Sequence, residues 1–88
     1  MREMLLDAET LYTRAQTHEA LAAAFSFPAD YGRNLDALYD LLCALPPTRL
    51  TLRHAEMLVV NMGNYGELLL RVLADAAAEN PAFALQTE

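Results

Sequence analysis

The sequence predicts an α/β fold in which helices pack around a small parallel sheet, and two observations favour this class. Three short segments have the pattern of strands, and segments with helical periodicity separate them along the chain. Strands that helices separate pair in parallel through crossover connections, which we expect to be right-handed. The length of 88 residues predicts a single domain, residues 1–88, with one small core and little room for an internal active-site cavity.

The first strand and the first helix are predicted in the N-terminal third of the chain. Residues 3–6 form a short apolar run, which is typical of a strand. Thr13 and Gln16 have the spacing of a capping box, in which the two side chains satisfy free N–H groups at a helix start. The helix should continue through Phe25 and end before Pro28, because proline cannot extend a helix.

A second helix is predicted after a turn at residues 31–34. Gly32 is expected to take a positive φ in that turn, and Asn34 is a favourable N-cap. The apolar side chains of the helix recur at i, i+3, i+4 and i+7, and this stripe consists of Leu35, Leu38, Tyr39 and Leu42. We expect the stripe to face the core.

The C-terminal half predicts a strand, an ambiguous segment, a long helix and a last strand. Residues 49–53 alternate between polar and apolar, as in a half-buried strand. Residues 54–64 fit either a strand or a short helix, and the order of elements favours the helix. Residues 65–80 predict the clearest helix, and residues 82–86 the last strand. The inward stripe of that helix is expected to be Tyr65, Leu68, Leu69, Val72, Leu73 and Ala76.

The charge balance indicates which partners the chain can attract. Six arginines and no lysine stand against twelve acidic residues, so the net charge is −6. Such a chain repels nucleic acid and anionic membranes and attracts a basic protein, although an acidic surface also serves solubility alone. The absence of a long apolar stretch and of a secretory signal, together with Cys43 as the only cysteine, favours a cytoplasmic protein without disulfides.

Few residues are arranged for catalysis or metal binding. His18 and His54 are far apart in the sequence and are expected to be ordinary surface or half-buried histidines. Cys43 has no partner at a ligand spacing, and the three glycines do not form a phosphate-binding loop. We therefore expect no metal, no cofactor, no small-molecule substrate and no catalytic residue.

Asp36 and Asp40 lie one turn apart on the side of the second helix opposite its apolar stripe. Asp36 is in the first turn, where the helix dipole stabilises a negative charge, whereas Asp40 has no such structural reason. The pair could serve as acid and base only in a cleft that separates the two pKa values. A solvated face is an alternative, but with Tyr31 and Asn34 the two acids also make a patch suited to binding a protein.

These residues resemble a known family. The stretch Phe27-Pro28-x-x-Tyr31-Gly32-x-Asn34-Leu35-Asp36-Ala37-Leu38-Tyr39-Asp40 is similar to the barstar family, the intracellular inhibitors of barnase-type bacterial ribonucleases. A weaker similarity runs along the rest of the chain. The resemblance implies a three-stranded parallel sheet with about four helices, and it assigns residues 54–64 to a helix.

The resemblance also implies a partner-binding surface on the second helix and the loop before it. Asp40 corresponds to the principal acid of the family, and an ungapped alignment of the last helix places Asp75 where the family often has a glutamate. Asp30 replaces a frequent second aromatic residue, and Arg33 adds a positive charge within the acidic patch. The candidate partner-binding residues are Asp30, Tyr31, Gly32, Arg33, Asn34, Asp36, Asp40 and Asp75.

The function that the resemblance implies is inhibition of a basic barnase-like ribonuclease by a monomer that binds it one to one and blocks its active site. The alternative is a protein-interaction domain of the same fold with another partner, such as a different toxin or a subunit. The changes at Asp30 and Arg33 are the features that favour this alternative.

Overall fold

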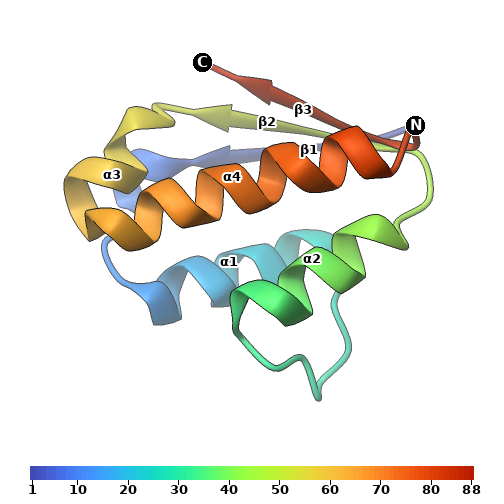
Figure 1. The fold of residues 1–88 in the computed structure, drawn as a ribbon, viewed down its shortest axis with the longest axis horizontal. Helices are drawn as coiled ribbons and strands as arrows, with labels where there is room; N and C mark the ends of the chain where they lie inside the picture. The colour runs from blue at the N-terminus through green and yellow to red at the C-terminus, as the bar shows by residue number, and fades with distance from the viewer.

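A computed structural model describes residues 1–88 and shows a three-stranded parallel sheet with four α-helices, as predicted (Figure 1). The segment that was ambiguous in the sequence contains a helix, as the family resemblance implies. In chain order the elements are β1 (Arg2–Asp7), the 3-10 helix η1 (Ala8–Thr10), α1 (Arg14–Phe25), α2 (Leu35–Cys43), β2 (Thr48–Arg53), α3 (Glu56–Met62), α4 (Asn64–Glu79) and β3 (Phe83–Thr87).

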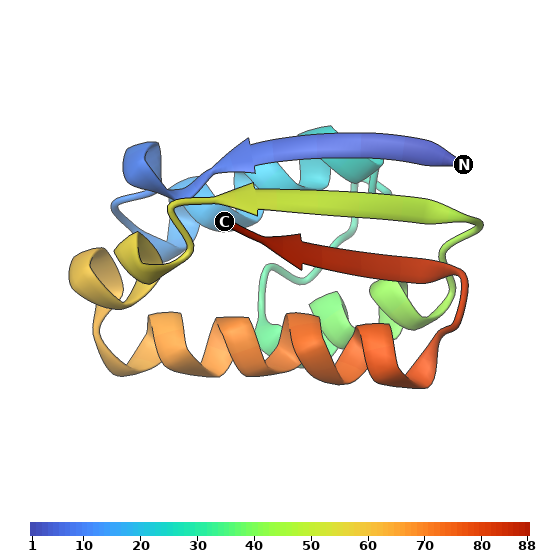
Figure 2. The ribbon, with the colours of Figure 1, turned by 90° about the horizontal axis from the view of Figure 1, so that it is seen from above.

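The sheet has the order β1-β2-β3, and all three strands run in the same direction (Figure 2). Leu50 in the central strand is paired with Met4 on one side and with Leu85 on the other. Helices α1, α2 and α4 lie on one face of the sheet, and no helix covers the opposite face (Figure 1). The strand β2 alternates accordingly, because Leu50 and Leu52 are buried whereas Arg49 and Arg53 are exposed.

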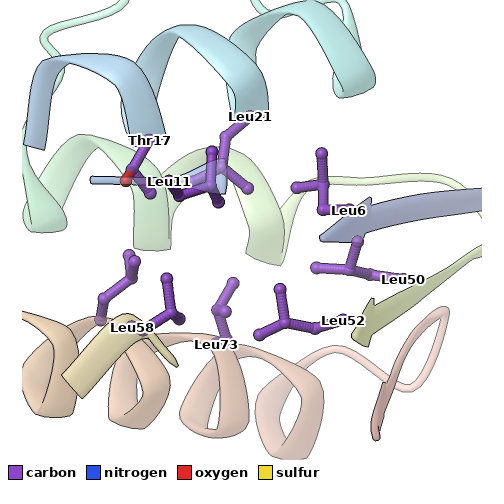
Figure 3. A pocket seen from close by; sticks show the side chains of 9 residues that line it. Leu6, Leu11, Thr17, Leu21, Leu50, Leu52, Leu58 and Leu73 are labelled. Atoms are coloured by element: carbon purple, nitrogen blue, oxygen red, sulfur yellow. The ribbon is translucent and has the colours of Figure 1, made fainter. Parts of the chain in front are cut away.

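The core between the sheet and the helices is filled mainly by leucines. A void of about 10 Å³ remains there, and the side chains around it are eight leucines and Thr17 (Figure 3). A void of this size holds at most one water molecule. As expected for a short chain, the interior offers no space for a ligand, so any functional site must lie on the surface.

The two faces of α2 follow the sequence pattern. Leu38 and Leu42 are completely buried, while Leu35 and Tyr39 are half-buried beside them. The helix begins at Asn34 as predicted, because Asn34 Oδ1 accepts a hydrogen bond of 2.8 Å from the Ala37 N–H. Since the apolar stripe faces the core, the carboxylates on the opposite side of α2 point into solvent.

Two details of the turn before α2 and of α4 differ from the sequence-based expectation. Gly32 does not have a positive φ; the left-handed residue of this turn is Arg33, with φ 53°. Glycine is nevertheless favoured at position 32, since a Cβ there would lie 2.9 Å from Asn34 Nδ2. In α4, Leu68 is 39% exposed rather than inward-facing, because it lies at the edge of the apolar stripe.

Helices α3 and α4 approach each other closely at Gly66. This residue is buried, and a Cβ at its position would overlap the carbonyl group of Leu58 in α3. The close contact therefore requires glycine, a role that the sequence did not reveal.

The longest helix, α4, has 16 residues, and no helix is long and apolar enough to cross a membrane.

Candidate functional site

The loop between α1 and α2 lies on the side of the helices farthest from the sheet (Figure 1). It leaves α1 through Ser26, which has a left-handed conformation, and it enters α2 at Asn34. Most of the predicted partner-binding residues are exposed on this loop and on α2: Asp30, Gly32, Arg33, Asn34, Asp36 and Asp40. The local fold therefore presents them together at one end of the molecule.

Three carboxylates form what we call the acidic surface: Asp30, Asp36 and Asp40. None of them takes part in an ion pair within the molecule, since every ion pair involves other acidic residues. Asp30 from the loop and Asp40 from α2 line the same open hollow, which has a volume of about 300 Å³. The structure thus brings together two acids that are ten positions apart, around a space large enough for a partner's side chain.

Arg33 does not contribute its charge to this hollow, contrary to the expectation that it lies within the acidic patch. Its Nε donates a hydrogen bond to Glu19 Oε1 in α1, and the two side chains form an exposed ion pair. Arg33 has this ion pair while its backbone is in the left-handed conformation, with φ 53°. As a result, the arginine neutralises an acid of α1 and leaves the α2 carboxylates unpaired.

Tyr31 is buried, whereas the sequence suggested an aromatic anchor exposed to a partner. Only 5% of the residue is accessible, and its ring packs against Phe27 with a distance of 4.9 Å between the ring centroids. The Tyr31 hydroxyl lies 2.6 Å from His18 Nδ1, and burial raises the pKa of the hydroxyl to about 12. Tyr31 therefore lines the hollow from within and supports the loop rather than projecting from it.

His18 is the residue that the sequence-based expectation placed wrongly, because it is only 1% exposed. Its Nδ1 faces the Tyr31 hydroxyl and its Nε2 faces the Tyr65 hydroxyl of α4, at 2.6 Å each. Burial, and to a lesser extent the charge of Arg33, lowers the pKa of His18, so the ring is neutral. The signal was present in the sequence, since His18, Leu21 and Phe25 have the i, i+3, i+7 spacing of one buried helix face.

His18 and Tyr31, which are buried, and Tyr65, which is half-buried, together form what we call the buried cluster. A neutral imidazole has one donor and one acceptor nitrogen, so one tyrosine hydroxyl donates to the ring and the other accepts from it. No buried side-chain nitrogen or oxygen of the protein lacks a hydrogen-bond partner. The cluster connects α1, the loop and the start of α4, and its Tyr31 also lines the hollow beside Asp30 and Asp40.

Asp75 is exposed on α4, as predicted, but it does not line the hollow. It lies near Tyr39 of α2, whose hydroxyl has a raised pKa. The main cause is the neighbouring Cys43 side chain, followed by burial and by the negative charges of Glu79 and Asp75. Asp75 therefore extends the negative charge around α2 onto the neighbouring helix.

The side chains of Asp7, Glu9 and His54 are the one group in the structure that could hold a metal ion, with three potential ligand atoms within 4.8 Å of one another. The sequence did not single out this group, because the residues meet only where β1 and β2 end side by side. His54 Nδ1 donates a hydrogen bond to Asp7 Oδ1 at 2.9 Å, which raises the pKa of His54. The pKa of Asp7 is lowered, first by the hydrogen bond that its carboxylate accepts from the Glu9 N–H and second by this bond from His54. This hydrogen bond accounts for the arrangement without a metal.

Comparison with known proteins places this geometry in a family. Residues 1–87 match the family described as "Barstar (barnase inhibitor)". The chain is also 33% identical, over 81 residues, to a protein of Bacillus subtilis (strain 168) named "Putative ribonuclease inhibitor YrdF". That alignment covers 90% of this chain and 89% of the relative.

The family match spans nearly the whole chain, and the observed sheet and helices agree with the fold that the resemblance implies. Members of this family are protein inhibitors and not enzymes. The chain therefore belongs to the barstar family of ribonuclease inhibitors.

Proposed function

We propose that the protein binds a basic, barnase-type ribonuclease one to one and blocks its active site with α2 and the preceding loop. The observation that carries this proposal is the acidic surface, in which Asp30, Asp36 and Asp40 are exposed and have no cationic partner within the molecule. Two of these acids line a single hollow. In the proposed complex, the nuclease supplies the positive charges with which these carboxylates pair.

The physical basis is substitution of a phosphate by a carboxylate. A ribonuclease active site holds the phosphate of RNA with cationic side chains, and a carboxylate on a rigid helix can accept the same charge-assisted hydrogen bonds. We assign the main role to Asp40, because it extends from the middle of α2 beside the hollow. The net charge of −6 would accelerate the encounter with a basic partner.

The other residues take supporting roles in this proposal. Asp30 and Asp40 both line the hollow, where a cationic side chain of the nuclease would meet both carboxylates. Gly32 keeps the rim of the hollow low, and Asn34 holds the start of α2 while remaining exposed to the partner. Asp75 is placed at the outer edge, where a charge contributes more to association rate than to affinity.

The test is to titrate the protein into a barnase-type ribonuclease and to follow RNA cleavage. We expect stoichiometric inhibition that weakens as ionic strength rises, and we expect Asp40→Ala to abolish most of it. Glu56→Ala is the matched control, because it removes one exposed negative charge from α3 and should inhibit like the wild type. The absence of binding at micromolar concentration to every nuclease of this type would contradict the proposal.

A different partner is the second candidate function, and the acid at position 30 is the observation that favours it. Asp30 places a second carboxylate on the hollow, where the family often has an aromatic residue. A nuclease that fills this hollow with an extended cationic side chain, or another toxin, would then be preferred. Comparing the affinities of the wild type and of Asp30→Tyr for one barnase-type nuclease distinguishes the two, since only a change of partner predicts that the variant binds more tightly.

We further propose that the free chain is a monomeric single domain and works in the cytoplasm. The lone, half-buried Cys43 supports a reducing compartment, and the single core supports a single folding unit. Sedimentation of the free protein at micromolar concentration tests the monomer, for which we expect the mass of one 9.8 kDa chain.

A further inference from the structure

We propose that His18 is a positioning residue for the partner-binding loop, acting through the hydroxyl of Tyr31. The inference deepens the proposed function, on which its binding readout rests. His18 does not reach the surface, so it cannot contact a nuclease itself. Its effect on inhibition would arise entirely from the conformation that it imposes on residues 28–34.

The loop has little backbone structure of its own. Within residues 28–33 the only backbone–backbone hydrogen bond is that from the Tyr31 N–H to the Pro28 carbonyl, at 3.0 Å. Side-chain contacts must therefore select its conformation. The one that is buried from solvent is the 2.6 Å contact between the Tyr31 hydroxyl and His18 Nδ1.

Two neighbouring residues of α1 hold the loop on both sides of Gly32. His18 binds Tyr31 from beneath, and Glu19 binds Arg33 at the surface. His18 is in turn held from the other side by the Tyr65 hydroxyl, at 2.6 Å from Nε2, and Arg14 lies over the Tyr65 ring at 4.2 Å from its centroid. The position of the loop is thus tied to α1 and, through His18, to α4.

The consequence for binding is preorganisation. Asp30 lies within the loop, so its position depends directly on the loop conformation. Asn34 at the end of the loop is the N-cap of α2, which carries Asp40. Both acids of the hollow therefore depend on how the loop is held. A loop that is already ordered loses little conformational entropy when the nuclease binds, whereas a loosened loop must be ordered at the expense of affinity. Most of the loss should appear as faster dissociation of the complex.

A matched pair of variants tests this inference. Tyr31→Phe and Tyr65→Phe each remove one hydroxyl that is bonded to His18 and keep the ring, so each should lower the free energy of unfolding, with the larger loss at the more deeply buried Tyr31. Only Tyr31→Phe releases the loop. We expect it to raise the Kd for the ribonuclease about tenfold, and Tyr65→Phe to raise it by less than about threefold.

Binding is measured at a temperature at which both variants are fully folded, and amide hydrogen exchange of residues 29–34 is measured in the free protein. We expect exchange in the loop to accelerate strongly in Tyr31→Phe and much less in Tyr65→Phe. A purely structural role for His18 predicts that the effects of the two variants on both measurements follow their losses of unfolding free energy, and that result would overturn the inference.

The two proposals fail in different ways. If the wild type does not inhibit any barnase-type ribonuclease, the proposed function is wrong, and loop exchange still decides whether His18 orders the loop. If the wild type inhibits and the two variants have equal Kd values, the proposed function holds and the positioning role is wrong. His18→Ala does not distinguish the two roles, because it opens a cavity and destabilises the loop and the fold together.

Discussion

Two layers of polar side chains lie at the loop of residues 28–34, and they are satisfied in opposite ways. In the acidic surface, Asp30 and Asp40 are exposed and have no cationic partner in the molecule. In the buried cluster beneath it, both ring nitrogens of His18 are engaged by tyrosine hydroxyls at 2.6 Å. The lower layer is satisfied within the free protein, whereas the carboxylates of the upper layer are hydrated and, in the proposed function, pair with cations of a partner.

The contrast teaches how this chain separates stability from binding. A buried polar group without a partner costs free energy, so the buried cluster must be satisfied for the protein to fold. An exposed carboxylate is hydrated and costs little in the free state, which allows Asp36 and Asp40 to remain available. Substitutions in the two layers should therefore affect different measurements, and the following predictions test this separation.

The largest effect on stability is expected from His18→Ala. The change leaves the hydroxyls of Tyr31 and Tyr65 without partners and opens a cavity, so we expect the free energy of unfolding to fall by about 4 kcal/mol. Urea denaturation followed by circular dichroism measures this loss. A decrease below about 1 kcal/mol would show that water or a rearranged side chain can replace the ring, and that the lower layer is not essential to the fold.

The largest effect on binding is expected from Asp40→Ala. We expect the affinity for a barnase-type ribonuclease to fall by at least about 2 kcal/mol, roughly thirtyfold in Kd. The free energy of unfolding should stay within about 0.5 kcal/mol of the wild type, since the side chain is exposed and unpaired. Calorimetric titration and urea denaturation of the same preparation provide both values. A comparable loss of stability would contradict the separation of the two layers.

Asn34 is exposed beside the acidic surface and also caps α2, so Asn34→Ala should affect both measurements moderately. Its Oδ1 caps α2 through the Ala37 N–H, and its Nδ2 donates to the Gly32 carbonyl at 3.2 Å. Loss of an N-cap destabilises a helix by about 1 kcal/mol. Asn34→Asp keeps the capping oxygen and is the matched control, for which we expect the stability of the wild type. An unchanged melting curve for Asn34→Ala would contradict the role of the cap.

The smallest effect is a dependence of stability on pH that the two histidines shape in opposite directions. Burial lowers the pKa of His18, so the unfolded chain binds the extra proton and stability falls as the pH drops below about 6.5. The hydrogen bond to Asp7 raises the pKa of His54, so its contribution is complete below about 6.5 and is lost as the pH rises through the folded-state pKa. The two groups together predict maximal stability near pH 6.5.

The variant His54→Gln distinguishes the two contributions. It should remove the loss of stability on the alkaline side and leave the loss on the acidic side unchanged, because His18 is retained. Thermal melting points measured from pH 5 to pH 8.5 in one buffer series report both slopes. If the stability of the wild type does not change below pH 6.5, the pKa of His18 is the same in the folded and the unfolded chain, and the prediction that burial lowers it is wrong.

Much of the fold was predictable because it depends on local patterns. The capping box of Thr13 and Gln16 and the N-cap at Asn34 form as predicted, since each requires only residues within one turn. The alternation in β2 and the apolar stripe of α2 also identify the buried faces correctly. The exposure of Asp36 and Asp40 follows directly from that stripe. The barstar-like motif then assigned residues 54–64 to a helix, which periodicity alone left open.

By itself, the sequence determined the order of the elements, the start of α2 and the face on which its acids lie, because periodicity and capping act between residues that are close in the chain. Only the tertiary structure decided that His18 meets Tyr31 and Tyr65, that Arg33 turns to Glu19 and that Gly66 permits contact with Leu58. These contacts join residues separated by 8 to 47 positions. Which residues meet in these contacts depends on how whole helices pack against the sheet, and no pattern within a few residues of the chain predicts that packing.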